Sequence, residues 1–200
     1  MTRFTLGEDI EARSLCTSDA PAVHALITAN RAHLDRWLRW SSSVQTLSDV
    51  QALITRFEEK EAIRDGFHLG IWDNGVLAGG VVCWYIHREN RNAEVGYWLG
   101  ASSQGKGLAT RAARAVIAHL FEAERLHRIE MQCGVDNTGS RAVAERCGLL
   151  AEGIRRDSHW ITDRFVNHVV YGILTTEWKR ADDAVVDGSQ PEKGRVIDPG

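Results

Sequence analysis

The chain has 200 residues, 44% of them hydrophobic, and its 24 basic and 27 acidic residues give a formal net charge of -3. This length and composition predict one globular domain with a sizeable core. The near-balanced charge does not favour a nucleic-acid backbone as the main partner. Four cysteines without a C-x-x-C spacing argue against a zinc ribbon or a disulfide framework, and no apolar run reaches 18 residues. We therefore expect a cytoplasmic protein with no membrane partner.

The first third of the chain predicts a strand followed by two helices. Residues 11–17 have the character of a strand, and apolar residues then recur at helical spacing through Trp37. The segment Ser48–Gln51 reads S-D-V-Q, the pattern of a capping box. It predicts the start of a second helix, which ends at Gly66.

The rest of the chain alternates between strands and helices. Asp73-Asn74-Gly75 is a strong hairpin signal between two apolar runs. After this hairpin the pattern predicts a third strand-like run, a glycine-rich loop, and then a helix, a strand, a short helix and two strands. The expected ranges are 67–72, 76–86, 93–99, 105–123, 129–135, 138–147, 149–160 and 165–175. Residues 1–178 are expected to form one domain, and 179–200 a disordered tail with little apolar periodicity.

The glycine-rich loop at residues 100–107 reads G-A-S-S-Q-G-K-G. It is almost a nucleotide-binding P-loop, but Gly107 stands where a hydroxyl would bind magnesium. A dinucleotide fingerprint also fails, because Thr110 occupies a position that requires glycine or alanine. A glycine loop that opens a helix can nevertheless hold a phosphate through unpaired backbone N–H groups.

The six residues from Gln104 to Ala109 match the pattern Q/R-x-x-G-x-G/A. This pattern resembles the pyrophosphate loop of the GNAT N-acetyltransferases. The segments A-E-V-G-Y-W-L before the loop, V-D-N-T-G-S-R-A-V-A-E-R-C-G-L-L-A-E-G after it, and N-R-A-H-L-D-R-W-L-R-W near the N-terminus resemble the RimJ/RimL subgroup. The resemblance implies an α+β fold with a central mixed, mostly antiparallel sheet of about seven strands flanked by helices.

The same resemblance implies that acetyl-CoA is the co-substrate. Its pyrophosphate would be held by the loop residues, and its pantetheine arm would lie along the strand end at Trp98 and Leu99. Asn137 belongs to the same binding region. The residues implied at the loop are Gln104, Gly105, Lys106, Gly107, Leu108, Ala109 and Thr110. For Lys106, a solvated side chain is an equally good interpretation.

Three side chains are candidates for the chemistry. Ser140 would give a proton to the departing thiolate, although it could also be only a first-turn residue of a helix capped by Asn137. Glu94 would relay the amine proton through water, or else form a structural ion pair. His159 could be a base or a structural histidine. RimL-type sequences carry an acidic residue at the position of His159, so this difference leaves the acceptor open.

The remaining candidates concern the acceptor and other types of chemistry. Trp37 and Trp40 could form the floor of the acceptor pocket or pack in the core. Cys133 and Cys147 are expected to be small buried hydrophobes rather than nucleophiles. The eight histidines show no metal-binding spacing, so no metal is expected.

These features together predict an enzyme that moves an acetyl group from acetyl-CoA to a primary amine by direct attack. The preferred acceptor is a protein N-terminal α-amine of the ribosomal-protein type. One alternative is a small-molecule amine such as an antibiotic, and another is a non-catalytic acyl-CoA-binding module. A monomer or a homodimer is expected.

Overall fold

The computed structural model describes residues 1–178, so the tail expected at 179–200 lies outside the described residues. One mixed sheet of eight strands forms the centre of the molecule, in the order β1-β2-β3-β4-β5-β6-β8-β7. All neighbouring strands are antiparallel except β5 and β6. The strands are β1 (Arg3–Gly7), β2 (Ile10–Ser14), β3 (Phe67–Asp73), β4 (Val76–His87), β5 (Asn92–Leu99), β6 (Arg128–Gly134), β7 (Leu150–Ile161) and β8 (Arg164–Leu174).

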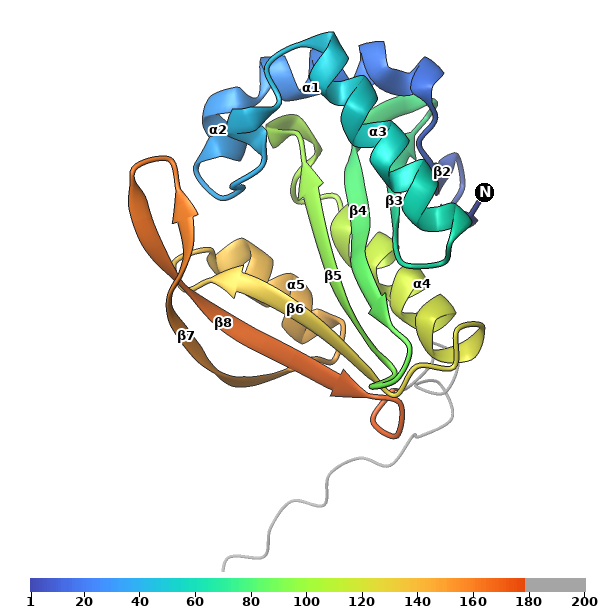
Figure 1. Ribbon diagram of the computed structural model, residues 1–200, viewed down its shortest axis with the longest axis vertical. Helices are drawn as coiled ribbons and strands as arrows, with labels where there is room; N and C mark the ends of the chain where they lie inside the picture. Colours follow the sequence, from blue (N-terminus) through green and yellow to red (C-terminus); the bar gives the residue numbers. More distant parts are fainter. Residues whose placement is uncertain (179–200) are drawn as a thin grey trace, which may run out of the picture.

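Helices cover both faces of this sheet (Figure 1). They are α1 (Ala20–Ala29), α2 (Arg31–Asp35), α3 (Leu47–Ala62), α4 (Leu108–Glu122) and α5 (Thr138–Arg146). Alternate residues of β3 show the division between the faces, since Leu69 belongs to the core formed with α4, whereas the ring of His68 contacts Phe57 of α3. Period-two alternation in the strands thus produces two cores, one on each face.

The expected mixed, mostly antiparallel sheet flanked by helices is confirmed, but the sheet has eight strands rather than about seven. The additional strand is β1, which pairs with β2 through Arg3 and Arg13 among others. Its five residues give a weak signal, although Phe4 and Leu6 pack against the core beside α4.

The helix expected to run through Trp37 is divided in two at Asn30. The Asn30 side-chain Nδ2 donates to the carbonyl of Leu26 at 2.9 Å, and its Oδ1 accepts from the backbone N–H of Ala101 at 2.8 Å. Asparagine competes with helical backbone bonding in this way, so α1 ends and α2 begins with a changed direction. The same side chain joins this corner to the glycine-rich loop.

The start of α3 corrects the proposed capping box. Thr46 is the N-cap, because its Oγ1 accepts from the N–H of Asp49 at 3.1 Å, and the Asp49 carboxylate accepts from the N–H of Thr46 at 2.8 Å. Ser48 and Gln51 therefore lie inside the helix. A T-x-x-D box satisfies the same orphan donors as S-x-x-E, and it begins two residues earlier. The α4 helix likewise begins at Leu108 rather than near residue 105.

His68 gives the core an acid-sensitive element. Trp98 Nε1 donates to His68 Nε2 at 3.1 Å, and burial lowers the pKa of His68 to about 4 from 6.5. The unfolded chain therefore binds more protons than the folded chain between these two pH values, so the free energy of unfolding falls as the pH is lowered from 6.5 towards 4.

We expect His68→Phe to remove about 2 kcal/mol of the acid-induced loss between pH 7.5 and pH 5, because each pKa unit corresponds to about 1.4 kcal/mol. Urea unfolding of both proteins at the two pH values measures this difference. The variant also deprives the Trp98 indole of its acceptor, but that cost is the same at both pH values. An identical pH dependence in the variant and the parent would contradict this role for His68.

Candidate functional site

The central feature of the site is the separation of β5 from β6, the only parallel pair of neighbouring strands within residues 1–178. The register joins residues 92–94 of β5 to residues 128–130 of β6 and goes no further. Figure 1 shows the two strands diverging beyond this point. A cavity of about 1270 Å³ occupies this region, lined by residues of both strands, the glycine-rich loop, α3 and β7. We call this space between the diverging strands the wedge. It exposes the facing edges of β5 and β6 to a ligand.

Nearly all of the residues singled out in the sequence line this one cavity. The structure brings together residues far apart in the chain because the loop, the strands and the α2 region converge on the wedge. The lining includes Trp37, Trp40, Glu94, Trp98, Leu99, Gln104, Gly105, Gly107, Leu108, Ala109, Thr110, Asn137, Ser140 and His159. Lys106 is not part of it, and its Nζ lies 3.8 Å from a carboxylate oxygen of Asp73.

The glycine-rich loop has the features of an anion site. Gly105 and Gly107 adopt left-handed backbone conformations with φ of 76° and 74°, and no atom lies within 4 Å of a Cβ placed at Gly105. Gly107 is the N-cap of α4, so the first-turn N–H groups have no partner within the helix. The Thr110 hydroxyl in this turn is buried without a hydrogen-bond partner among the described residues. These donors fit the pyrophosphate of a coenzyme A.

At the end of β5, backbone rather than side chain faces the wedge. The Trp98 indole is 3% exposed and is bound to His68 on the face covered by α1 and α3. Leu99 lies in the core on the α4 face. Pairing with β6 stops at Glu94, so the strand edge beyond it is available for hydrogen bonds to a ligand.

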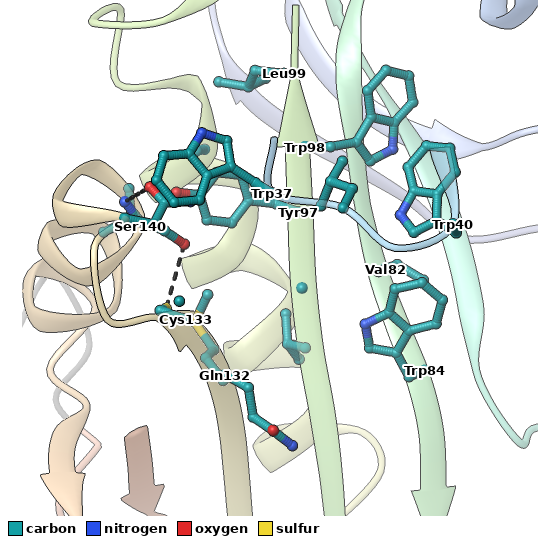
Figure 2. Close-up of a pocket in the computed structure, with 18 of the residues that line it drawn as sticks. Trp37, Trp40, Val82, Trp84, Tyr97, Trp98, Leu99, Gln132, Cys133 and Ser140 are labelled. Carbon is teal, nitrogen blue, oxygen red and sulfur yellow. Dashed lines mark hydrogen bonds between the residues drawn. The ribbon is translucent and has the colours of Figure 1, made fainter. Parts of the chain in front are cut away.

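Ser140 lies near the start of α5. Its backbone N–H donates to the Asn137 side chain at 3.1 Å, and its Oγ donates to Cys133 Sγ at 3.3 Å (Figure 2). Tyr97 lies near Ser140, and burial raises the pKa of Tyr97 to about 12. Asn137 is thus the helix cap, as one of the two interpretations of this motif required.

Glu94 lies deeper in the wedge. Its Oε2 accepts from Gln132 Nε2 at 3.0 Å, and Gln132 Oε1 accepts from Arg155 Nη1 at 3.2 Å. Burial raises the pKa of the Glu94 carboxyl above its ordinary 4.5, more than the Gln132 bond lowers it. No arginine or lysine among residues 1–178 forms an ion pair with Glu94, so its partner is an amide and not the cation of the structural alternative.

His159 belongs to a compact polar cluster with Ser158 and His168. The Ser158 hydroxyl lies 3.1 Å from Nδ1 of His159 and 3.2 Å from Nδ1 of His168, and the two imidazole rings are 4.0 Å apart. Burial, followed by the neighbouring His168, Arg39 and Arg155, lowers the pKa of His159 to about 4. The imidazole is therefore neutral at pH 7 and only a weak base.

The indoles of Trp37, Trp40 and Trp84 also line the cavity. Trp40 and Trp84 lie on one side of β5 in Figure 2, and Trp37 lies towards Tyr97 and Ser140. The Trp40 ring packs edge-on against Trp98, with ring centroids 5.7 Å apart. Trp40 therefore both packs on the core and borders the cavity, which combines the two interpretations of this residue.

Tyr97, Gln132 and Trp84 were not found among the candidates from the sequence. Tyr97 precedes Trp98 in the same strand, and alternation places its side chain on the opposite face, so the quoted strand itself held the signal. Gln132 and Trp84 gave no such signal. Their roles depend on β4 and β6 lying on either side of β5, which only the sheet order shows.

The described part of the chain has neither a cluster of metal ligands nor a membrane-spanning helix. No group of three or more histidine, cysteine or acidic side chains within residues 1–178 could hold a metal ion. In the same part of the chain, no helix has the length and apolar character needed to span a bilayer.

A glycine-rich phosphate loop at a helix start, beside a wedge between two parallel strands, defines an acyltransferase that uses a coenzyme A thioester. Residues 10–150 match the family described as "Acetyltransferase (GNAT) domain", so the chain belongs to this family. It is an N-acetyltransferase with acetyl-CoA as co-substrate. The family assignment replaces the P-loop interpretation of the loop.

Several similar proteins are named as acetyltransferases. The chain is 32% identical over 175 residues to "Putative ribosomal N-acetyltransferase YdaF" of Bacillus subtilis, covering 87% of this chain and 96% of that protein. It is 28% identical over 160 residues to the ribosomal-protein-serine acetyltransferase of Escherichia coli, covering 80% and 89%. The structure of microcin C7 self-immunity acetyltransferase MccE, with acetyl-CoA and AMP, superposes with a TM-score of 0.81 at 27% identity, covering 84% and 94%.

Proposed function

We propose that this enzyme acetylates the α-amine at the N-terminus of a protein, by direct attack of the amine on acetyl-CoA. The observation that carries the proposal is the continuous cavity that joins the glycine-rich loop to Glu94 and the three indoles. A cavity with a donor end and an acceptor end allows both substrates to bind together. The names of the relatives in Bacillus subtilis and Escherichia coli support a ribosomal protein as the acceptor.

At the donor end, the backbone of residues 104–109 and the Thr110 hydroxyl would hold the pyrophosphate of acetyl-CoA, which supplies the acetyl group as a thioester. The unpartnered Thr110 Oγ1 and the first-turn N–H groups are suited to this role. The edge of β5 near Trp98 and Leu99 would receive the pantetheine arm. The side chain of Lys106 is not assigned to the phosphate, because it faces Asp73.

We assign the general base to Glu94 rather than His159. A base must take a proton from an amine whose ordinary pKa is near 8. Burial raises the pKa of Glu94 towards that range and lowers the pKa of His159 to about 4, away from it. Glu94 would act through water, while the neutral His159 would orient the acceptor with Ser158.

Ser140 is the proposed proton donor to the departing thiolate, and Tyr97 positions it. The serine hydroxyl donates to Cys133 Sγ at 3.3 Å, and the Tyr97 phenol lies near it. Burial raises the pKa of the Cys133 thiol, and it also raises that of Cys147, to about 11. Neither thiol is therefore a ready nucleophile, which favours direct attack over an acyl-cysteine route.

A thiol-release assay with acetyl-CoA tests this proposal. One acceptor pool contains peptides with Ser, Ala or Met at the N-terminus, and the other contains small amines that include aminoglycosides and aminoacyl nucleotides. Turnover on the Ser or Ala peptides is the expected result, and N-terminally blocked peptides of the same sequence provide the control. Turnover on the small amines alone would overturn the choice of acceptor. Tight binding of acetyl-CoA without turnover of any acceptor would favour a binding module.

An acceptor on newly made ribosomal proteins would place the enzyme in the cytoplasm. The four cysteines are free in the structure, as suits a reducing compartment. Whether the enzyme acts as a monomer or a homodimer stays a prediction, and sedimentation measurements would decide it.

A further inference from the structure

Three exposed arginines surround the acceptor side of the cavity. Arg39 follows α2, Arg56 lies on α3 and Arg155 lies on β7, and all three line the cavity. These residues, which we call the arginine rim, come from three separate segments of the chain. Lys60 also lines the cavity, but its Nζ is paired with the Asp65 carboxylate at 2.5 Å.

The arginine rim has no acidic partners among the described residues. Other exposed arginines of the fold are paired, as Arg64 is with Glu124 at 3.0 Å and Arg88 with the same carboxylate at 2.7 Å. No carboxylate within residues 1–178 lies within ion-pair distance of a rim arginine. Glu94 is the single acidic residue of the cavity lining. Within the described residues, three rim arginines therefore face a single lining carboxylate, so the acceptor side carries a surplus of positive charge.

The rim charges are directed towards the place where the acceptor would lie. Arg39 and Arg155 both contribute to the lowered pKa of His159, so both charges lie near this imidazole. Arg155 also bonds Gln132, the amide that holds Glu94. The positive charge of Arg155 therefore lies close to Glu94, the proposed base.

We infer that the acceptor is an acidic N-terminal segment, with Asp or Glu side chains within the first few residues after the reacting amine. This inference rests on the proposed function and narrows its substrate class. A chain extends about 3.3–3.6 Å per residue, so side chains at positions two to five can reach rim arginines while the amine lies near Glu94. Opposite charges across such a surface steer binding and set specificity.

A phosphate-bearing small amine has related chemistry but fits the rim less well. A single phosphate is usually held by donors that converge on it in a fixed fork. The rim arginines are instead exposed and spread over three elements. This spread suits several carboxylates along an extended chain.

Paired peptides provide the test. One peptide begins with Ser followed by four residues rich in Asp and Glu, and its matched partner carries Asn and Gln at the same positions. We expect kcat/KM for the acidic peptide to be about three- to tenfold higher at 50 mM KCl, since exposed ion pairs are individually weak. The ratio should approach one at 500 mM KCl, because salt screens exposed charges.

The triple variant Arg39→Gln, Arg56→Gln, Arg155→Gln should lose this preference. Arg125→Gln is the control, because Arg125 is exposed and lies outside the cavity lining. This substitution removes one positive charge and leaves the rim unaltered. Thermal unfolding of each variant shows whether it is folded, and each single rim variant should reduce the ratio if the triple variant does not fold.

The possible failures are distinguishable. Equal rates on the acidic and amide peptides would overturn the acidic acceptor and leave protein N-terminal acetylation standing. A preference that persists in folded rim variants would also overturn it. Turnover of an aminoacyl nucleotide with no turnover of either peptide would overturn both the acidic segment and the proposed protein acceptor.

Discussion

Replacing Glu94 with Gln is expected to lower kcat by about 10²–10⁴-fold, the range typical of a lost general base. Glutamine keeps the shape of the side chain and can still accept the 3.0 Å hydrogen bond from Gln132 Nε2 through its amide oxygen. The loss would therefore reflect the missing proton acceptor rather than a collapsed wedge. The Kd for acetyl-CoA should be unchanged, because the donor loop is a separate part of the cavity.

The pH dependence provides a second and more specific readout of this variant. The carboxylate must be ionised to accept a proton, so the activity of the parent falls as the pH drops through the Glu94 pKa. Burial sets that pKa above 4.5, so the acidic limb of the kcat profile lies at a correspondingly higher pH. The Gln variant should lack this limb.

Two matched variants complete the experiment. Glu89→Gln, in the exposed turn between β4 and β5, makes the same chemical change and should leave kcat unaltered. His159→Gln should cost less than Glu94→Gln, because the His159 pKa of about 4 makes it a poor base. A larger loss at His159, with the acidic limb abolished there, would assign the proton to the histidine and refute the role of Glu94.

Gly79→Ala is expected to have the largest effect on stability. A Cβ at Gly79 would lie 2.1 Å from the carbonyl oxygen of Trp98 and 2.8 Å from the Cα of Leu99. Both of these are backbone atoms of the neighbouring strand, so no side-chain rotation can relieve the clash. We expect a loss of about 3 kcal/mol or more in the free energy of unfolding, at the upper end of what overpacking usually costs.

The same substitution should weaken acetyl-CoA binding, because relief of the clash pushes the end of β5 away from β4. Urea unfolding measures the first effect, and calorimetric titration with coenzyme A measures the second. Gly153→Ala is the control, since no atom lies within 4 Å of a Cβ there. Stability and affinity equal to those of the parent in Gly79→Ala would show that β4 and β5 are not held at the spacing described here.

The parts of the fold that were predictable depended on local signals. The Asn74-Gly75 hairpin, the glycine loop and the apolar stripe of α4 follow from turn chemistry and periodicity. The short strand β1 and the break at Asn30 did not, because each is stabilised by contacts distant in sequence, such as the bond from Ala101 to Asn30. Local propensity carries no record of such partners.

The residues of the candidate site also divide into those with a local sequence signal and those that depend on contacts distant in sequence. The donor loop and Ser140 could be named from a motif, because consecutive residues perform the function. The Gln132 partner of Glu94 and the shared Ser158 hydroxyl of the two histidines could not. These groups meet only through the order of the strands and the bulge between Arg155 and His159. Charge partners in particular depend on which strands are neighbours.

The amide of Asn30 has a wider significance than the division of α1 from α2. One end of this side chain holds the α1 carbonyl of Leu26, and the other holds the first N–H after Gly100. Gln104 of the same loop also approaches His33 of α2, with the side-chain nitrogens 3.3 Å apart. The helices α1 and α2 are therefore connected to the glycine-rich loop through side-chain contacts. We therefore expect a substitution of Asn30 to affect both halves of the cavity at once, whereas a substitution away from this contact can affect one half alone.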